Sequence, residues 1–414
     1  MEHVQRESFD LTQRTIFGLL GQQLFDVPFA PEEGVDWEDV LRESKNQAVF
    51  CQVFADCHEL PGMDEALRNE TWNRLAKGTL KNMRVHAQHT DLHSLMTSQK
   101  IPYVTLKGAA SARYYPDPQS RGMGDVDFYV GEGDYDRAME VCRDAGFEAS
   151  GLDHICHVVL RKGRVHMEMH RMPAGVPDGQ VGEIVKGYLS TLQEDAILVQ
   201  NPQVTCWCPS DFHHGLIMLL HMQHHMLAEG IGLRHLCDWA VFVNHFREEA
   251  FPGMFREKLQ AIGLWRLARL LSLCAVCCLG LPRQSWMVED AADPELALAL
   301  MEDILSGGNF GRKDRQRVYE GMFISNRGKD GVRNRRISQG VQALTRITYM
   351  KYPMVEKYPV LLPFGWVAAF GGYLVRTRER NKKGYEIHAL SAFRKSASRI
   401  SLYQQLGLFE PEQR

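Results

Sequence analysis

Two carboxylates separated by one residue have the clearest chemical potential in the chain. Asp125 and Asp127 occur in the sequence Gly-Asp-Val-Asp-Phe-Tyr-Val, where apolar and polar residues alternate. This alternation is the period of a strand with one apolar face. Side chains two residues apart on a strand point the same way, so both aspartates are expected on the other face. Neighbouring carboxylates repel each other, and Mg²⁺, which prefers oxygen ligands, would relieve that repulsion.

A third acid occurs in a second alternating segment, Val165-His-Met-Glu-Met-His170. If the two strands are neighbours, Glu168 joins Asp125 and Asp127 in a cluster of three carboxylates. Such a cluster can bind two Mg²⁺ ions and clamp a phosphoryl group during in-line displacement. The sequence therefore predicts a two-metal site in which these three acids are both the ligands and the catalytic residues.

The residues around these acids resemble the DNA polymerase β-like nucleotidyltransferase superfamily, and within it an uncharacterised bacterial nucleotidyltransferase family. The resemblance spans roughly residues 35 to 240 and rests on Leu106-Lys107-Gly108, Tyr115-Pro116, Arg121, Gly124-Asp125-Val126-Asp127, Ala145-Gly146-Phe147 and Glu168-Met-His170. It implies an Mg²⁺-dependent enzyme that moves an NMP group from an NTP to an acceptor hydroxyl and releases pyrophosphate.

The resemblance also indicates where the phosphates of the NTP would bind. Lys107 and Gly108 precede a short helix expected over residues 109–115, and the free N–H groups of a helix start bind phosphate. The superfamily commonly has serine where this chain has Ala109, although Ser111 lies close by. An ordinary surface lysine before a turn is the other interpretation of Lys107.

Two arginines are further candidates for contacts with the nucleotide. Arg121 lies four residues before Asp125, where it would bind a phosphate or orient a carboxylate, unless it is a simple loop charge. Arg234 begins an Arg-x-x-x-Asp sequence that also resembles the family, and at helical spacing it is expected to pair with Asp238. Whether this helix reaches the base or triphosphate, or only joins two helices, stays open.

Histidines recur at helical spacing in two predicted helices. One set is His86, His89 and His93, and the other is His214, His221 and His225. Either set is a conceivable metal site. We favour an exposed polar face for the first set and a polar seam facing the cleft for the second.

The composition is that of a soluble globular protein, with 414 residues of which 44% are hydrophobic and 24% charged,. The ten cysteines are scattered, and the N-terminus has no signal pattern, so we expect reduced thiols in a cytoplasmic protein,. The predicted fold class is α+β, with a small mixed sheet flanked by helical regions. We expect an N-terminal helical region over 1–98, a catalytic core over 99–204, a helical region closing the cleft over 205–310, and a basic C-terminal helical region over 311–414.

Charge is unevenly distributed along the chain. Residues 312–414 contain 21 lysines and arginines but 8 acids, whereas the whole chain has a net charge of −3. Either a surface for an anionic partner or a solvated basic face would explain this segment. Its apolar run over 360–375 is shorter than a membrane-spanning helix. Core packing is favoured for this run, and peripheral contact with an anionic surface at the inner face of the membrane is the alternative.

The acceptor cannot be read from the sequence. A saccharide, a lipid-linked intermediate, a peptide and RNA all stay open, as does the choice between ATP and another NTP. Two other functions are retained. A catalytically inactive nucleotide-binding or interaction protein of the same fold is suggested by Ala109, and an RNA end-modifying enzyme is suggested by the basic C-terminal region.

Overall fold

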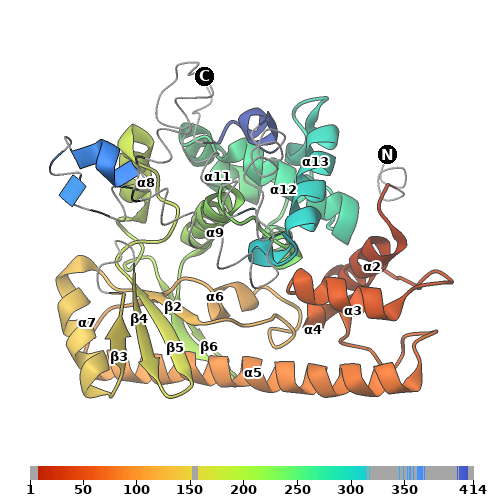
Figure 1. Ribbon diagram of the computed structural model, residues 1–414, viewed down its shortest axis with the longest axis horizontal. Coiled ribbons are helices and arrows are strands. Elements are labelled where there is room, and N and C mark those ends of the chain that lie inside the picture. Colours follow the sequence, from red (N-terminus) through yellow and green to blue (C-terminus); the bar gives the residue numbers. More distant parts are fainter. Residues whose placement is uncertain are drawn as a thin grey trace.

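The computed structural model describes residues 8–151 and 157–314, together with 317, 345, 348, 352, 354, 355, 358, 361–366, 368, 399 and 401–408. Within these residues a five-stranded sheet and a two-stranded sheet are surrounded by helices, which confirms the α+β class. Figure 1 shows the five-stranded sheet lying between one long helix below it and a group of helices above it.

The five-stranded sheet is mixed, as predicted. Its order is β1 (Val104–Thr105), β2 (Val126–Tyr129), β5 (Val165–His170), β4 (His157–Lys162) and β3 (Glu148–Ser150). Strands β2 and β5 are parallel, and the other neighbours are antiparallel. The register places Asp127 directly opposite Glu168.

The alternation in β2 and β5 decides which side chains are buried. The apolar residues Val126, Phe128, Met167 and Met169 are at most 2% exposed. They form a core with residues from α5 (Glu65–Ser98) and α7 (Glu132–Asp144). Helix α5 has 34 residues and runs beneath both the sheet and the N-terminal helices (Figure 1). Because one face of the sheet is used by this core, the acidic residues must lie on the other face.

A second, larger core is formed by helices from both halves of the chain. These are α2 (Leu11–Phe25), α3 (Trp37–Asn46), α4 (Phe50–Val53), α9 (Asp211–Met226), α10 (Leu233–Asn244), α11 (Ala250–Ala261), α12 (Trp265–Leu279) and α13 (Asp293–Gly307). Helix α12 lies at its centre and contacts α2, α10, α11 and α13. Short elements complete the fold: α6 (Ala109–Ala112), α8 (Gly179–Leu189), β6 (Ile197–Gln200), β7 (Thr205–Cys208), η1 (Ser285–Met287) and η2 (Asn309–Gly311).

Two arginines of the basic C-terminal region are buried. Arg317 and Arg399 are 4% and 6% exposed, and both form ion pairs with Asp303 of α13, at 2.9 and 3.3 Å. Their charges hold the last described segment against the helical core and are not offered to a partner. Most of the region expected over 311–414 lies outside the described residues.

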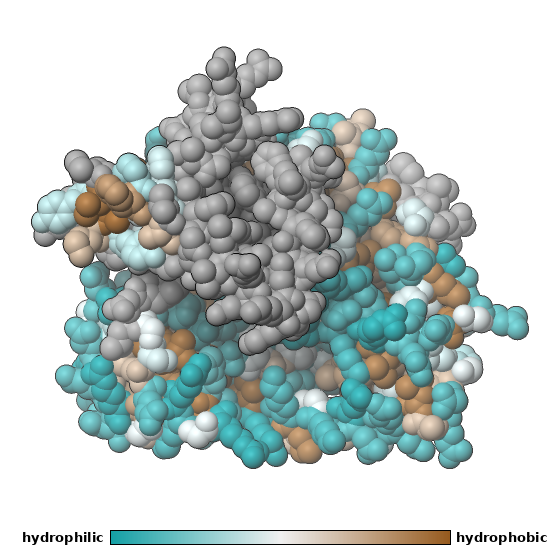
Figure 2. All heavy atoms as spheres, viewed as in Figure 1, coloured by the Kyte–Doolittle hydropathy of each residue, from teal (hydrophilic) through white to brown (hydrophobic). Residues whose placement is uncertain are grey.

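The apolar run over 360–375 is described only at 361–366 and 368. Core packing is wrong for two of these residues, since Leu361 is 39% and Phe364 75% exposed. With the exposed residues Met354 and Tyr358 they form a surface patch, whose apolar side chains are visible at the upper left of Figure 2. Among the residues that the structure describes, no helix has the length and apolar character needed to cross a membrane.

Candidate active site

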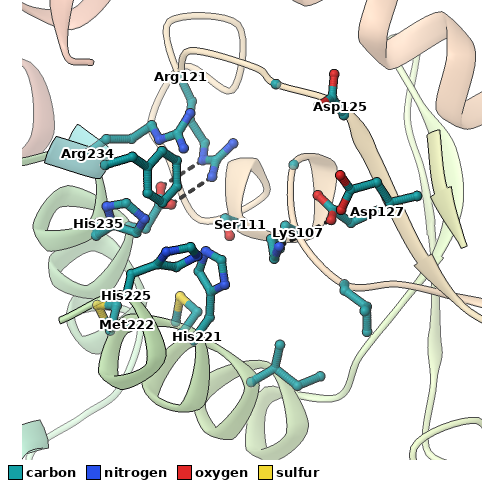
Figure 3. Close-up of a pocket in the computed structure, with 18 residues that line it drawn as sticks. Lys107, Ser111, Arg121, Asp125, Asp127, His221, Met222, His225, Arg234 and His235 are labelled. Carbon is teal, nitrogen blue, oxygen red and sulfur yellow. Dashed lines mark hydrogen bonds and ion pairs between the residues drawn. The ribbon is translucent and has the colours of Figure 1, made fainter. Parts of the chain in front are cut away.

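A cavity of about 270 Å³ lies between the sheet and helices α9 and α10. The side chains of its two walls differ in charge, and Figure 3 shows them facing each other. The wall from the sheet and the preceding loops includes Lys107, Gly108, Ser111, Asp125, Asp127 and Glu168. The wall from the helices includes His221, Met222, His225, Arg234, His235 and Phe310. The cavity thus has an acidic side and a side rich in imidazole and guanidinium groups.

Asp127 is the most deeply buried acid on the sheet side of the cavity. Its side chain is almost fully buried, and its Oδ1 accepts hydrogen bonds from Lys107 Nζ and His170 Nε2, each at 3.1 Å. Burial alone would raise the pKa of Asp127, but the Lys107 ammonium and the His170 imidazole outweigh it and hold the pKa well below its usual range,. Asp127 is therefore ionised at neutral pH.

Glu168 lies beside Asp127 and shares its histidine. His170 Nε2 is 3.5 Å from Glu168 Oε2, and His157 Nε2 is 3.9 Å from the same oxygen. Burial opposes protonation of His170, yet its hydrogen bonds to Asp127 and Glu168 outweigh burial and raise its pKa,. The buried imidazole therefore screens the repulsion between the two carboxylates.

Asp125 stands apart from the other two acids. Its side chain is 52% exposed, and its Oδ1 lies 3.1 Å from His166 Nδ1. Figure 3 shows its carboxylate at the rim of the cavity, turned away from that of Asp127. Asp125 precedes the first residue of β2, so the strand ladder does not fix its side chain. The structure brings Asp127 and Glu168 together and leaves Asp125 at the mouth.

The donor set on this side fits a divalent cation. His157, Glu168 and His170 each offer a ligand atom, and these atoms all lie within 4.8 Å of one another. The carboxylate of Asp127 adjoins them, and carboxylate oxygens are the ligands that Mg²⁺ prefers,. The imidazoles would equally suit a softer ion of the first transition row. Lys107 already neutralises Asp127, so a metal ion would share that carboxylate with the ammonium group.

The turn at Lys107-Gly108 requires glycine for two reasons. Gly108 has a φ of +61°, and a Cβ there would lie 3.0 Å from Nε2 of the buried His89. The glycine thus accommodates its own backbone and a histidine beneath it. Ser111 is buried and lines the cavity, whereas Ala109 is buried and is not one of the lining residues.

The exposed polar face expected for the histidines of α5 is wrong. His86 and His89 are 2% and 0% exposed, and His93 is half-buried. Burial lowers the pKa of His89 to about 3, so this imidazole is neutral. The prediction of an exposed face failed because α5 is covered near His89 by the loops around Gly108 as well as by the sheet. The helix therefore has two buried faces.

The expected pairing of Arg234 with Asp238 is also wrong. Asp238 accepts two hydrogen bonds from Arg121, both at 2.7 Å, and a third from Tyr115 Oη, also at 2.7 Å. Arg121 therefore orients a carboxylate, but that of Asp238 rather than of Asp125. In the described part of the chain, no carboxylate forms an ion pair with Arg234. Burial and the nearby Arg121 charge lower the pKa of Arg234.

Two of the three histidines expected on a seam face the cavity. His221 and His225 line it, while His214 is fully buried and stacks on Tyr114 with ring centroids 5.2 Å apart. On this side of the cavity, the described residues form no cluster of three metal ligands. Burial lowers the pKa of His221 well below its usual range, so it is neutral.

Several residues at the site were missed from the sequence. They include His157 of the possible metal cluster, His235 and Phe310 of the cavity lining, and His166, which contacts Asp125. His157 was detectable in principle, since a two-residue turn at Gly163 places it opposite His170 in the β4–β5 hairpin. Phe310 gave no signal, because it reaches the cavity from a short turn after α13.

One comparison with known proteins identifies a family for this chain. The model of a family described as uncharacterised nucleotidyltransferase matches residues 33–280. No curated protein matches the chain. The matched region includes both sheets and α9 to α12, and it ends before η2.

Proposed function

The chain belongs to the uncharacterised nucleotidyltransferase family, and on that premise we propose that it moves an NMP group from an NTP to an acceptor hydroxyl in a divalent-metal-dependent reaction. The observation that carries this proposal is the position of Asp127 opposite Glu168 on parallel strands, at the wall of a cavity that also contains Lys107. Paired carboxylates that can hold two metal ions are a typical arrangement for in-line displacement at a phosphoryl group.

Asp127 and Glu168 would hold the metal ions, and Asp125 would join them by rotating from the rim. Bound Mg²⁺ would supply charge neutralisation at the α-phosphate and lower the pKa of the acceptor hydroxyl. Asp127 is a poor proton acceptor because Lys107 and His170 stabilise its ionised form. We therefore propose that Glu168, whose side chain is 25% exposed, takes the proton from the acceptor hydroxyl.

The nucleotide would lie across the cavity. We propose that the main-chain N–H groups of Gly108 and Ala109, with the Ser111 hydroxyl, hold the β- and γ-phosphates. Lys107 would offset part of their charge. Arg121 lines the same wall. Its Nη1 donates to Met123 Sδ, a weak acceptor, at 3.5 Å, and we therefore assign this group as a further phosphate contact.

Arg234 would contact the nucleotide from the opposite wall. It lines the cavity without an ion-pair partner in the described part of the chain, so an electron-rich ligand group would satisfy it,. This assignment leaves the acceptor open among a saccharide, a lipid-linked intermediate, a peptide and RNA.

Release of pyrophosphate tests this proposal directly. Each labelled NTP is incubated with the protein, Mg²⁺ and fractionated cell extract, and both pyrophosphate and the labelled acceptor are measured. We expect one NTP to react, with loss of reaction in EDTA and in Asp127→Asn. Replacing Glu302, an acid of α13 outside the cavity, by Gln is the matched control and should leave turnover unchanged. Undiminished turnover in Asp127→Asn would refute the assignment.

A catalytically inactive nucleotide-binding protein of the same fold is the second candidate, favoured by Ala109 at the position of the usual serine. Calorimetry separates the two, because this candidate binds the NTP without releasing pyrophosphate. RNA end modification gains no support from Arg317 and Arg399, two basic residues of the C-terminal region, because both are buried and paired with Asp303.

A further inference from the structure

The turn η2 holds an aromatic ring in the cavity by an unusual backbone conformation. Phe310 has φ 55° and ψ 45°, which is left-handed, and its side chain is 36% exposed where it lines the cavity. Residues other than glycine are sterically disfavoured in this conformation. A non-glycine residue that adopts it is therefore worth examining for function. The flanking Gly308 and Gly311 both have a φ of +66° and form the rest of the turn.

The turn is fixed against the start of α10. A Cβ added to Gly232 would lie 2.8 Å from backbone atoms of Asn309, and one added to Gly311 would lie 3.2 Å from the Glu229 carbonyl oxygen. These close approaches leave little freedom for the segment to shift. Phe310 is therefore a ring on a rigid support, unlike an exposed aromatic residue on a loose loop.

The ring lies beside three polar side chains, and two of them, Arg234 and His235, have a nitrogen without a hydrogen-bond partner among the residues described. The Phe310 centroid lies 4.6 Å from that of His225, 5.1 Å from that of His235 and 5.8 Å from the Arg234 guanidinium carbon. His235 is 5% exposed, and its Nδ1 accepts from the Gly232 N–H at 3.3 Å. Its Nε2 then carries the proton, and this atom has no partner among the residues described.

We propose that Phe310 is the stacking platform for the base of the NTP, with Arg234 and His235 donating hydrogen bonds to the edge of that base. This inference rests on the proposed function and names a part of the same site. A nucleobase is a flat ring whose edge carries acceptors, and it matches an aromatic residue that is 36% exposed, lines the cavity and lies beside two donors,. The acidic wall with Lys107 and Gly108 would hold the phosphates of the same nucleotide.

The charges on this wall favour a base over the polyphosphate. Among the lining residues of this wall, Arg234 is the single permanent cation, since Lys107 lies on the opposite wall, as does Arg121, which pairs with Asp238. Burial lowers the pKa of His221 and of His235 well below the usual range, so both are neutral at physiological pH. One guanidinium and neutral imidazoles suit a polar, uncharged ring edge better than a triphosphate tail.

Phe310 lies thirty residues beyond the region that matches the family, which ends at residue 280. The platform is therefore a property of this chain's own continuation and is not implied by family membership. Selection among nucleotides would then reside in η2 and in Arg234 and His235 at the start of α10, while the chemistry resides in the sheet.

Calorimetry with the full-length protein tests this inference. The four NTPs and inorganic tripolyphosphate are titrated into wild type and Phe310→Leu in the presence of Mg²⁺. Loss of the ring should weaken the tightest-binding NTP by about 5- to 100-fold. Tripolyphosphate, which has no base, should bind both proteins equally. Trp72→Ala removes an aromatic ring that is 46% exposed on α5, outside the cavity, and as the matched control should leave NTP binding unchanged.

A second variant keeps the test decisive if Phe310→Leu folds poorly. Phe310→Trp retains a ring, so NTP binding should be kept, and the fluorescence of the introduced indole should be quenched by NTP but not by tripolyphosphate. Equal NTP affinity in wild type and Phe310→Leu, or an equal loss of NTP and tripolyphosphate binding, would overturn the inference. Pyrophosphate release with unaltered binding in Phe310→Leu retains the proposed function alone. Binding that depends on Phe310 without turnover retains the inference alone, and failure of wild type to bind any NTP overturns both.

Discussion

Replacing Asp238 by Asn should destabilise the protein by leaving the Arg121 guanidinium buried without a counter-charge. Arg121 and Asp238 are 5% and 8% exposed, and two hydrogen bonds of 2.7 Å join them. Removing one partner of such a pair costs about 3–5 kcal/mol, because the remaining charge stays desolvated. Asparagine still accepts one hydrogen bond, so we expect a loss near the lower end, about 3 kcal/mol.

The pair can be separated from the packing around it by removing both charges. Arg121→Met combined with Asp238→Leu fills similar space with apolar groups and leaves no orphan charge. The double variant should therefore be more stable than the sum of the two single losses predicts, by about 2 kcal/mol. The four proteins of this cycle are wild type, Arg121→Met, Asp238→Leu and the double variant. Urea unfolding followed by tryptophan fluorescence measures the free energy of unfolding of each.

Arg234→Met is the matched control, because this guanidinium lies on the same helix four residues before Asp238. The structure gives it no ion-pair partner in the described residues, so its removal should leave the free energy of unfolding unchanged or raise it. If Arg234→Met costs as much as Arg121→Met, then Asp238 pairs with Arg234 after all. A loss below about 1 kcal/mol for Asp238→Asn would likewise refute the reasoning.

Three further predictions concern the acidic wall. Asp125→Asn and Asp127→Asn should both stop pyrophosphate release, but only Asp127→Asn should lower the thermal midpoint, because Asp127 is buried with two partners and Asp125 is half-exposed. His170 has a raised pKa, so its ion pairs contribute stability that is complete below its ordinary pKa of 6.5 and is lost as pH rises through the raised value,. Thermal midpoints measured against pH should therefore fall above pH 6.5 in wild type, and less steeply in His170→Gln. Gly108→Ala should cost about 1–2 kcal/mol in urea unfolding, since its φ is +61° and the new Cβ meets His89; an unchanged midpoint would contradict that geometry,.

The parts of the site that follow local rules could be predicted from the sequence. The two-residue period placed the buried faces of β2 and β5 correctly. The prediction was conditional on these strands being neighbours, and the structure meets that condition by placing Glu168 opposite Asp127 on parallel strands. Whether Asp125, Asp127 and Glu168 act as metal ligands and catalytic residues stays a prediction.

The errors came from contacts between segments far apart in the chain. Helical spacing correctly put Arg234 and Asp238 on one side of α10, but it could not detect Arg121, which is 117 residues away and binds Asp238 with better geometry. The same limit applies to His89, whose burial depends on a turn nineteen residues later. Spacing rules compare a residue only with its neighbours on the same element.

Contact between α2 and α12 has a consequence for how the chain is made. Helix α2 contributes Ile16, Phe17 and Leu20 to a core that also includes α12, and α12 is complete only when residue 279 has been synthesised. At typical rates of translation, roughly 10–50 s separate the emergence of the two helices. During that interval the nascent chain exposes the apolar surface of α2 that later packs against α12, and a holding chaperone would recognise it. Part of the core surface of α2 therefore stays exposed until a segment far later in the chain has been synthesised.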